Sequence, residues 1–211
     1  SKSKVLNSLT SQEKKLKQEL TQKQRESAIL NRAIQNAINR EIEEARKRAE
    51  AEARAAAAKA KAENKDAPDY KPVASGSSIL AATPESAKLS SDFLGSRGSL
   101  PWPVTNGMII EDFGNHTIGK NVTTENNGVD IKTAPGSAVR AVFGGEVAAV
   151  QNISGSYAVL IRHGEYFTVY AKLRTVTVST GDEITVKQSI GSVYTSKEGE
   201  SELQFQIWKN E

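Results

Sequence analysis

Residues 126–147 read NNGVDIKTAPGSAVRAVFGGEV, and this stretch decides the fold of the C-terminal half of the chain. Short runs rich in Val, Ile and Ala are separated here by Ala134-Pro135-Gly136 and Gly144-Gly145, which are turn signals. Further along, residues 176–180 (VTVST) and 202–208 (ELQFQIW) alternate apolar and polar side chains with the period of a strand. Residues 100–211 are therefore predicted to form an all-β domain of antiparallel strands, barrel-like or sandwich-like, large enough to bury its own core.

The N-terminal third has a different composition. Residues 1–65 carry 16 Lys or Arg against 9 Asp or Glu, whereas residues 66–211 carry 12 against 16. Such an asymmetry indicates two parts with different surfaces. The basic part contains no Phe, Trp or Tyr on which bases could stack, so the pattern favours a solvated helix face and argues against a nucleic-acid partner.

Residues 1–65 are predicted to form one long helical arm. No Pro or Gly occurs between positions 5 and 63, and the tract from 49 onward is rich in the strongest helix formers. A seam with a seven-residue repeat is interrupted at Glu13, Lys23 and Ser27 and then shifts phase, as in a coiled coil with a four-residue stutter. The seam consists of Leu6, Leu9, Leu16, Leu20, Leu30, Ile34 and Ala37, followed by Ile38, Ile42, Ala45 and Ala49. A stripe this narrow needs a partner, so the arm is either a spacer or a docking element for another protein.

Residues 66–99 are predicted to be a linker with one short helix. Pro, Ser and Gly end the arm, and Thr83 followed by Pro84 and Glu85 is a helix start signal. Leu89 and Phe93 give the helix over residues 84–94 one small apolar face. Two interpretations remain open. The helix either packs on the outer wall of the β-domain, which is the favoured interpretation, or covers a functional groove as a lid.

The order of short motifs in residues 100–211 carries a family resemblance. In order, the chain reads WPV, an FG, NxGxD, GxV, YAxL, GD, IG and LQFQIW. This series resembles the catalytic domain of the lysostaphin/LytM-type zinc endopeptidases, which cleave peptide cross-links in bacterial cell walls. The resemblance implies a zinc site on the floor of a long groove that holds an extended peptide.

The positions that would hold zinc in that family have changed here. The implied ligand positions are Asn126, Asp130 and Gln204, and Lys172 and Glu202 stand where further histidines are expected. Amide oxygens are weak donors for zinc, and a lysine adds a repelling charge, so we expect no catalytic metal, no cofactor and no enzyme activity. The chain has only two histidines and no cysteine. His163 is expected to be structural and His116 to lie in a solvated loop.

What remains is a groove without its metal, which we expect to bind a partner. The candidate groove residues are Asn126, Asp130, Tyr157, Tyr170, Lys172, Glu202 and Gln204. LytM domains with a degenerate ligand set behind an N-terminal coiled coil resemble the EnvC-like murein hydrolase activators. That resemblance implies a non-catalytic activator of zinc-dependent N-acetylmuramyl-L-alanine amidases during cell division. The alternatives are a non-catalytic peptidoglycan-binding or scaffold module and, least favoured, a residual zinc endopeptidase.

Compartment and further partners follow only from the resemblance. It implies a periplasmic protein whose coiled coil contacts a divisome complex similar to an ABC transporter, with peptidoglycan as a possible further ligand. The chain shows no signal peptide and no apolar run of the ~20 residues needed to span a bilayer.

Overall fold

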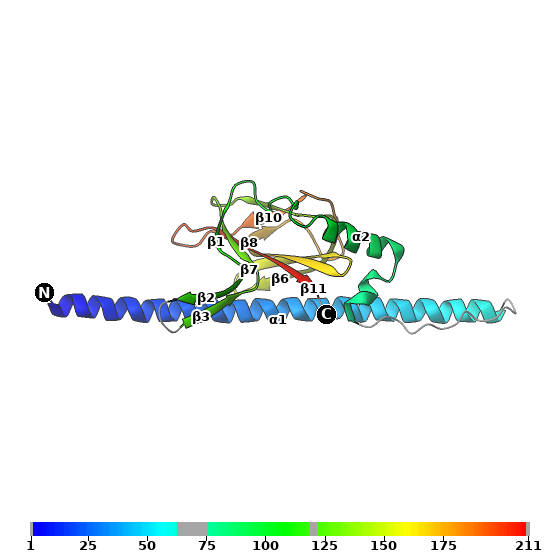
Figure 1. Ribbon diagram of the computed structural model, residues 1–211, viewed down its shortest axis with the longest axis horizontal. Coiled ribbons are helices and arrows are strands. Elements are labelled where there is room, and N and C mark those ends of the chain that lie inside the picture. The colour runs from blue at the N-terminus through cyan, green and yellow to red at the C-terminus, as the bar shows by residue number, and fades with distance from the viewer. Residues whose placement is uncertain (1, 63–75, 119–121, 210–211) are drawn as a thin grey trace.

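The structure is a computed structural model that describes residues 2–62, 76–118 and 122–209. A single long helix lies along one side of a β-domain and extends beyond it at both ends (Figure 1). The helices are α1 (Lys2–Ala62), the 3₁₀ helix η1 (Gly76–Ala81) and α2 (Pro84–Gly95). The strands are β1 (Met108–Glu111), β2 (Gly114–Ile118), β3 (Val122–Asn126), β4 (Val129–Lys132), β5 (Ala138–Arg140), β6 (Gly145–Ile153), β7 (Ser156–His163), β8 (Tyr166–Val176), β9 (Glu183–Ile184), β10 (Ser189–Val193) and β11 (Glu202–Lys209).

The predicted long helix is confirmed. α1 spans 61 residues, which corresponds to about 90 Å at 1.5 Å per residue. Ion pairs one turn apart support its exposed face, among them Arg46 with Glu50 at 3.2 Å. Residues 63–75, which include the first part of the predicted linker, lie outside the described residues.

The antiparallel β-domain is also confirmed, although its arrangement is one branched sheet and a separate hairpin. Nine strands form one sheet, seven of them in the order β1-β4-β11-β8-β7-β6-β9 and the other two, β10 and β5, off this path; among the described residues β2 pairs only with β3. β8 is the branch point, because its first half pairs with β11 and its second half with β10, which in turn pairs with β5. Every pairing between named strands is antiparallel.

The central strands are buried on both faces. Along β7, Val159 and Ile161 belong to the core inside the domain, whereas Ala158 and Leu160 belong to a second core against α1. Successive side chains of a strand point to opposite faces, so a strand covered on both sides needs an apolar run rather than alternation. This explains why β7 reads as YAVLI in the sequence.

α1 has its partner within the same chain. Leu30, Ile34, Ala37 and Ile38 are each at most 5% exposed and pack on the outer face of the sheet, against side chains of β6, β7 and β8. Beside them, Arg162 Nε lies 3.4 Å from Glu41 Oε2. The middle of the predicted seam therefore binds a sheet, and no helix among the described residues pairs with it as a coiled coil. Farther toward the N-terminus, Leu9 and Leu16 remain 58% and 65% exposed.

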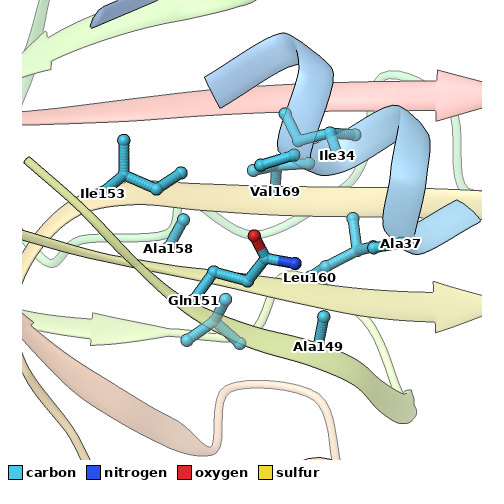
Figure 2. A pocket seen from close by; sticks show the side chains of 10 residues that line it. Ile34, Ala37, Ala149, Gln151, Ile153, Ala158, Leu160 and Val169 are labelled. Atoms are coloured by element: carbon cyan, nitrogen blue, oxygen red, sulfur yellow. The ribbon is translucent and has the colours of Figure 1, made fainter. Parts of the chain in front are cut away.

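The contact between α1 and the sheet is close because several of its residues are alanines. Figure 2 shows Ile34 and Ala37 of α1 facing Ala149, Ala158, Leu160 and Val169 of the strands. The cavity between them has a volume of only about 10 Å³. A space of this size holds at most one water molecule, so this interface is structural.

α2 forms as predicted and packs on the outer wall of the β-domain. The Thr83 hydroxyl accepts a hydrogen bond from the backbone N–H of Ser86, which caps the helix. The Phe93 ring stacks on His163, with ring centroids 4.8 Å apart, and also contacts Phe143 and Tyr166. Tyr166 begins β8, whereas Lys172 lies six residues further along the same strand. α2 therefore packs on the outer wall, at the opposite end of β8 from Lys172.

Candidate functional site

A glycine allows the chain to pass close to β11 at the start of the site. A Cβ at Gly128 would lie 2.1 Å from the backbone oxygen of Phe205, so only glycine lets the chain approach β11 this closely. Asn126 and Asp130 stand on either side of Gly128, at the end of β3 and within β4. The close approach of Gly128 thus positions both.

The strand register then aligns the polar side chains. Asp130 on β4 is paired with Glu111 on β1 and with Gln204 on β11. Residues directly opposite each other in a sheet point to the same face. One row across three strands therefore carries a carboxylate, a second carboxylate and an amide.

Lys172 enters the same site through an unusual backbone conformation. Its backbone φ angle is +64°, in the left-handed region that residues other than glycine rarely adopt. The conformation occurs where β8 leaves β11 for β10, at an irregularity in the register. Such a kink re-aims a side chain, and here the ammonium group lies 2.7 Å from Glu202 Oε2 and 3.3 Å from Asp130 Oδ2.

A second lysine comes from α1. Lys23 Nζ lies 2.5 Å from Glu111 Oε2 and 3.6 Å from Asp130 Oδ2. Three carboxylates and two ammonium groups therefore meet in one cluster, and the helix that covers it is α1.

Burial and the neighbouring charges shift the pKa values of these groups in opposite directions. Burial raises the pKa of Asp130, which is 1% exposed, and the charges of Lys172 and Lys23 only partly offset the rise. Burial also acts to raise the pKa of Glu202, but the hydrogen bond and charge of Lys172 outweigh it, so that pKa is lowered. For Lys23, burial acts to lower the pKa, but the hydrogen bond to Glu111 and the charge of Asp130 outweigh it and the pKa is raised.

The amides of the site bond to each other. Gln204 Nε2 donates to Asn126 Oδ1 at 3.4 Å, and the same oxygen accepts from the backbone N–H of Gly128 at 3.2 Å. Asn126 Nδ2 donates to the backbone oxygen of Glu111 at 3.5 Å. Both amides are buried and held within this network.

Comparison with known proteins relates this part of the chain to a family. Residues 124–211 match peptidase family M23. This part of the chain is similar to the peptidase family M23 domain. Among curated proteins, the murein hydrolase activator NlpD of Salmonella typhimurium is 27% identical over 68% of this chain and 38% of its own length. The uncharacterized lipoprotein YgeR of Escherichia coli is 30% identical over 63% of this chain.

The chain spans about half the length of YgeR, 52%, and less of NlpD. Among solved structures, lysostaphin is 24% identical to this chain, with a TM-score of 0.44 over 50% of this chain and 45% of its own. In the part of the chain that the structure describes, no helix is long and apolar enough to cross a membrane.

The residues of this M23-like domain do not fit the zinc ion that the resemblance implies. Asn126 Oδ1 already accepts two hydrogen bonds, and Gln204 presents its N–H₂ group to it. Lys172 holds Asp130 Oδ2, which leaves Asp130 Oδ1 as the one buried oxygen of these residues without a partner. A catalytic zinc needs three protein ligands, and the described residues contain no group of three His, Cys, Asp or Glu side chains suited to a metal ion.

Five of the seven predicted groove residues meet in the site, whereas Tyr170 does not lie as expected. Tyr170 is fully buried, and its hydroxyl accepts the backbone N–H of Val142, so it is a core residue and cannot flank a groove. Tyr157 is 37% exposed and is paired with Leu173, next to Lys172. Tyr194, which the sequence analysis passed over, is 39% exposed and donates its backbone N–H to the Lys172 carbonyl.

Sequence reasoning also missed Lys23 and Glu111. A signal existed for Lys23, because it interrupts the apolar seam of α1 at the point where the helix passes the charged cluster. Glu111 gave no signal of its own, since its role follows from the register between β1 and β4.

The two histidines lie outside the site. His163 is fully buried, with Nδ1 donating to the Gly144 carbonyl at 2.6 Å and Nε2 lying 2.8 Å from Thr168 Oγ1, as expected of a structural histidine. His116 lies in β2 and not in a loop, with Nε2 2.6 Å from the Asp112 carbonyl oxygen.

Proposed function

We propose that this protein is a non-catalytic activator of cell-wall N-acetylmuramyl-L-alanine amidases and that it binds them through the charged cluster of its M23-like domain. The observation that carries the proposal is the contact between the Lys172 ammonium and Asp130, at the place where the family resemblance implies a zinc ion. The amides of Asn126 and Gln204, at two implied ligand positions, bond to each other instead. The relatives named murein hydrolase activators support the same assignment.

The chemistry of the cluster suits protein recognition. Lys172 and Glu202 keep 33% and 28% of their side chains exposed. Two partly exposed tyrosines are near Lys172 along the backbone: Tyr157 is paired with Leu173, and Tyr194 donates its backbone N–H to the Lys172 carbonyl. Partly exposed charged groups next to tyrosines resemble the centre and rim of a protein interface. In this structure α1 supplies the counter-charge through Lys23, so an amidase that engages Asp130 and Glu111 has to replace it.

The proposed function also implies a cellular compartment and further partners. We assign the protein to the periplasm and to cell division, because its function would require access to the wall and to the amidase. The N-terminal part of α1, where Leu9 and Leu16 are exposed, is the segment available for a membrane-associated divisome complex similar to an ABC transporter.

Binding measurements test the proposal against a peptidoglycan-binding or scaffold module. The full chain should bind a purified N-acetylmuramyl-L-alanine amidase, and Lys172→Glu should weaken that binding at least about tenfold, since reversing a partly buried interface charge costs on the order of 2 kcal/mol or more. Lys88→Glu, on α2 and away from the site, is the matched control. Tight binding to isolated sacculi with no affinity for any amidase would establish the scaffold function instead.

A further inference from the structure

β1 presents an exposed apolar surface next to the charged cluster. Met108 is 65% exposed, Ile109 40% and Ile110 44%, and Phe113, two residues after the strand, is 73% exposed. Single exposed apolar residues are ordinary, but four large ones within six positions expose apolar surface on both faces of this edge strand, and such a concentration marks an interaction site.

The backbone of β1 is open as well. β1 is the first strand in the order of the sheet and pairs with β4 alone, and no described residue pairs with its outer edge. A Cβ at Gly107 would lie 2.5 Å from Ile131 Cγ2, so the glycine lets the chain enter β1 tightly against β4. The N–H and C=O groups on the outer edge of β1 have no backbone partner and can pair with another extended chain. Neither a helix nor a sugar presents the row of backbone groups that this edge would bond.

A second copy of this chain does not fit this edge. β1 has four residues and a bulge between Ile109 and Glu111. A strand of four residues is about 14 Å long, and pairing two of them buries far less than the roughly 1,200 Å² of a stable interface.

Charge specifies the occupant further. Glu111 ends β1, is paired with Asp130, and holds the Lys23 ammonium of α1. A segment that pairs with β1 and runs past Glu111 takes the place of Lys23. It needs a Lys or Arg of its own there, because Glu111 would otherwise lose its counter-charge while Asp130 keeps only Lys172, and the two neighbouring carboxylates would repel each other.

We propose that β1 receives an extended segment of the activated amidase as an added strand. This segment places apolar side chains on Met108, Ile109 and Ile110 and a basic side chain on Glu111. The proposal rests on the proposed function and adds to it a second contact surface, a backbone geometry and a sequence pattern for the partner.

Backbone exchange and one matched pair of variants test it. The probe is the full-length N-acetylmuramyl-L-alanine amidase that the full chain binds and stimulates. On adding this amidase, amide hydrogen exchange in residues 108–111 should slow at least about tenfold, because outward N–H groups gain acceptors. Ile110→Asn should lower the affinity for the amidase about tenfold or more, whereas Val186→Asn should leave it unchanged. Val186 is the control because it is 50% exposed and follows β9, the last strand in the order.

Three results would overturn the proposal. If the amidase binds and is stimulated while exchange in β1 and the affinity of Ile110→Asn stay as in the wild type, β1 is not a contact surface and the proposed function stands alone. If the protein sediments as a dimer that Ile110→Asn converts to a monomer, the occupant is a second copy. If no amidase binds at all, the proposed function fails and the added strand with it.

Discussion

Asp130 shows how a single residue changes its role with its neighbours. It is almost fully buried, and its partners are two lysines, one from β8 and one from α1. A buried carboxylate needs such counter-charges, because burial alone already raises its pKa. The ion pairs with Lys172 and Lys23 therefore make Asp130 a structural anchor of the site.

Lys172→Glu should abolish stimulation of the amidase and also lower stability. The new carboxylate would lie beside Asp130 and Glu202, which the lysine now neutralises at 3.3 and 2.7 Å. These contacts lead us to expect a loss of about 1–3 kcal/mol in the free energy of unfolding. Denaturant unfolding and stimulation per folded molecule, measured on the same variant, separate the two effects. A destabilised variant with full stimulation would remove Lys172 from the interface.

His163 should make stability depend on pH. Burial lowers the pKa of His163 from 6.5 to about 4, so between these values the unfolded chain binds a proton that the folded chain does not. The free energy of unfolding should therefore fall as the pH drops from about 6.5 to about 4, by up to about 3 kcal/mol for this group. Urea unfolding at several pH values across this range measures this change in the free energy of unfolding. His163→Gln should flatten the slope and His116→Gln should keep it, whereas equal slopes in all three proteins would refute the assignment.

At the scale of the element, α1 was predictable in length but not in its partner. The absence of Pro and Gly fixes a helix over this tract, and the seam gives its apolar face. The same stripe of Leu30, Ile34, Ala37 and Ile38 can pack on a helix or on a sheet, and local sequence does not distinguish the two. The small side chains that admit the helix, such as Ala149 and Ala158, lie more than 100 positions away.

Lys23→Ala should release the charged cluster from α1. The N-terminal part of the helix has few other contacts, since residues 8–19 are exposed, whereas the segment around Ile38 stays docked. We expect a several-fold gain in apparent affinity for the amidase, because the partner no longer has to displace the lysine. Lys47→Ala, on the same helix and paired only with Glu43 nearby, is the control. Equal affinities of the two variants would mean that Lys23 does not compete with the partner.

At the scale of the whole molecule, the sheet depends on the helix. The site itself was largely predictable, because the motif order identifies Asn126, Asp130, Lys172, Glu202 and Gln204, and the register of β4 and β11 brings them together. Tyr170 was placed wrongly, since alternation along β8 turns it into the inner core. Lys23 and Glu111 were missed, because they depend on how α1 docks and how β1 pairs.

Removal of α1 should therefore impair a domain that looks independent in the sequence. Residues 100–211 were predicted to bury a core of their own, and they do so inside the sheet, but Leu160, Phe167 and Val169 are covered from outside by α1 and η1. A fragment of residues 100–211 should have a lower melting temperature and bind an apolar dye. Thermal unfolding of the fragment and of the full chain measures the difference. Equal melting temperatures would show that residues 1–99 contribute nothing to the stability of the sheet.

The most direct test of the central claim is the release of dye from labelled cell walls by this protein alone, by the amidase alone, and by both. In saturating zinc the protein alone should release nothing, because its donor set cannot bind a catalytic metal ion, and the mixture should release several-fold more than the amidase alone. Zinc-dependent release by the protein alone, abolished by Asp130→Ala, would contradict the account.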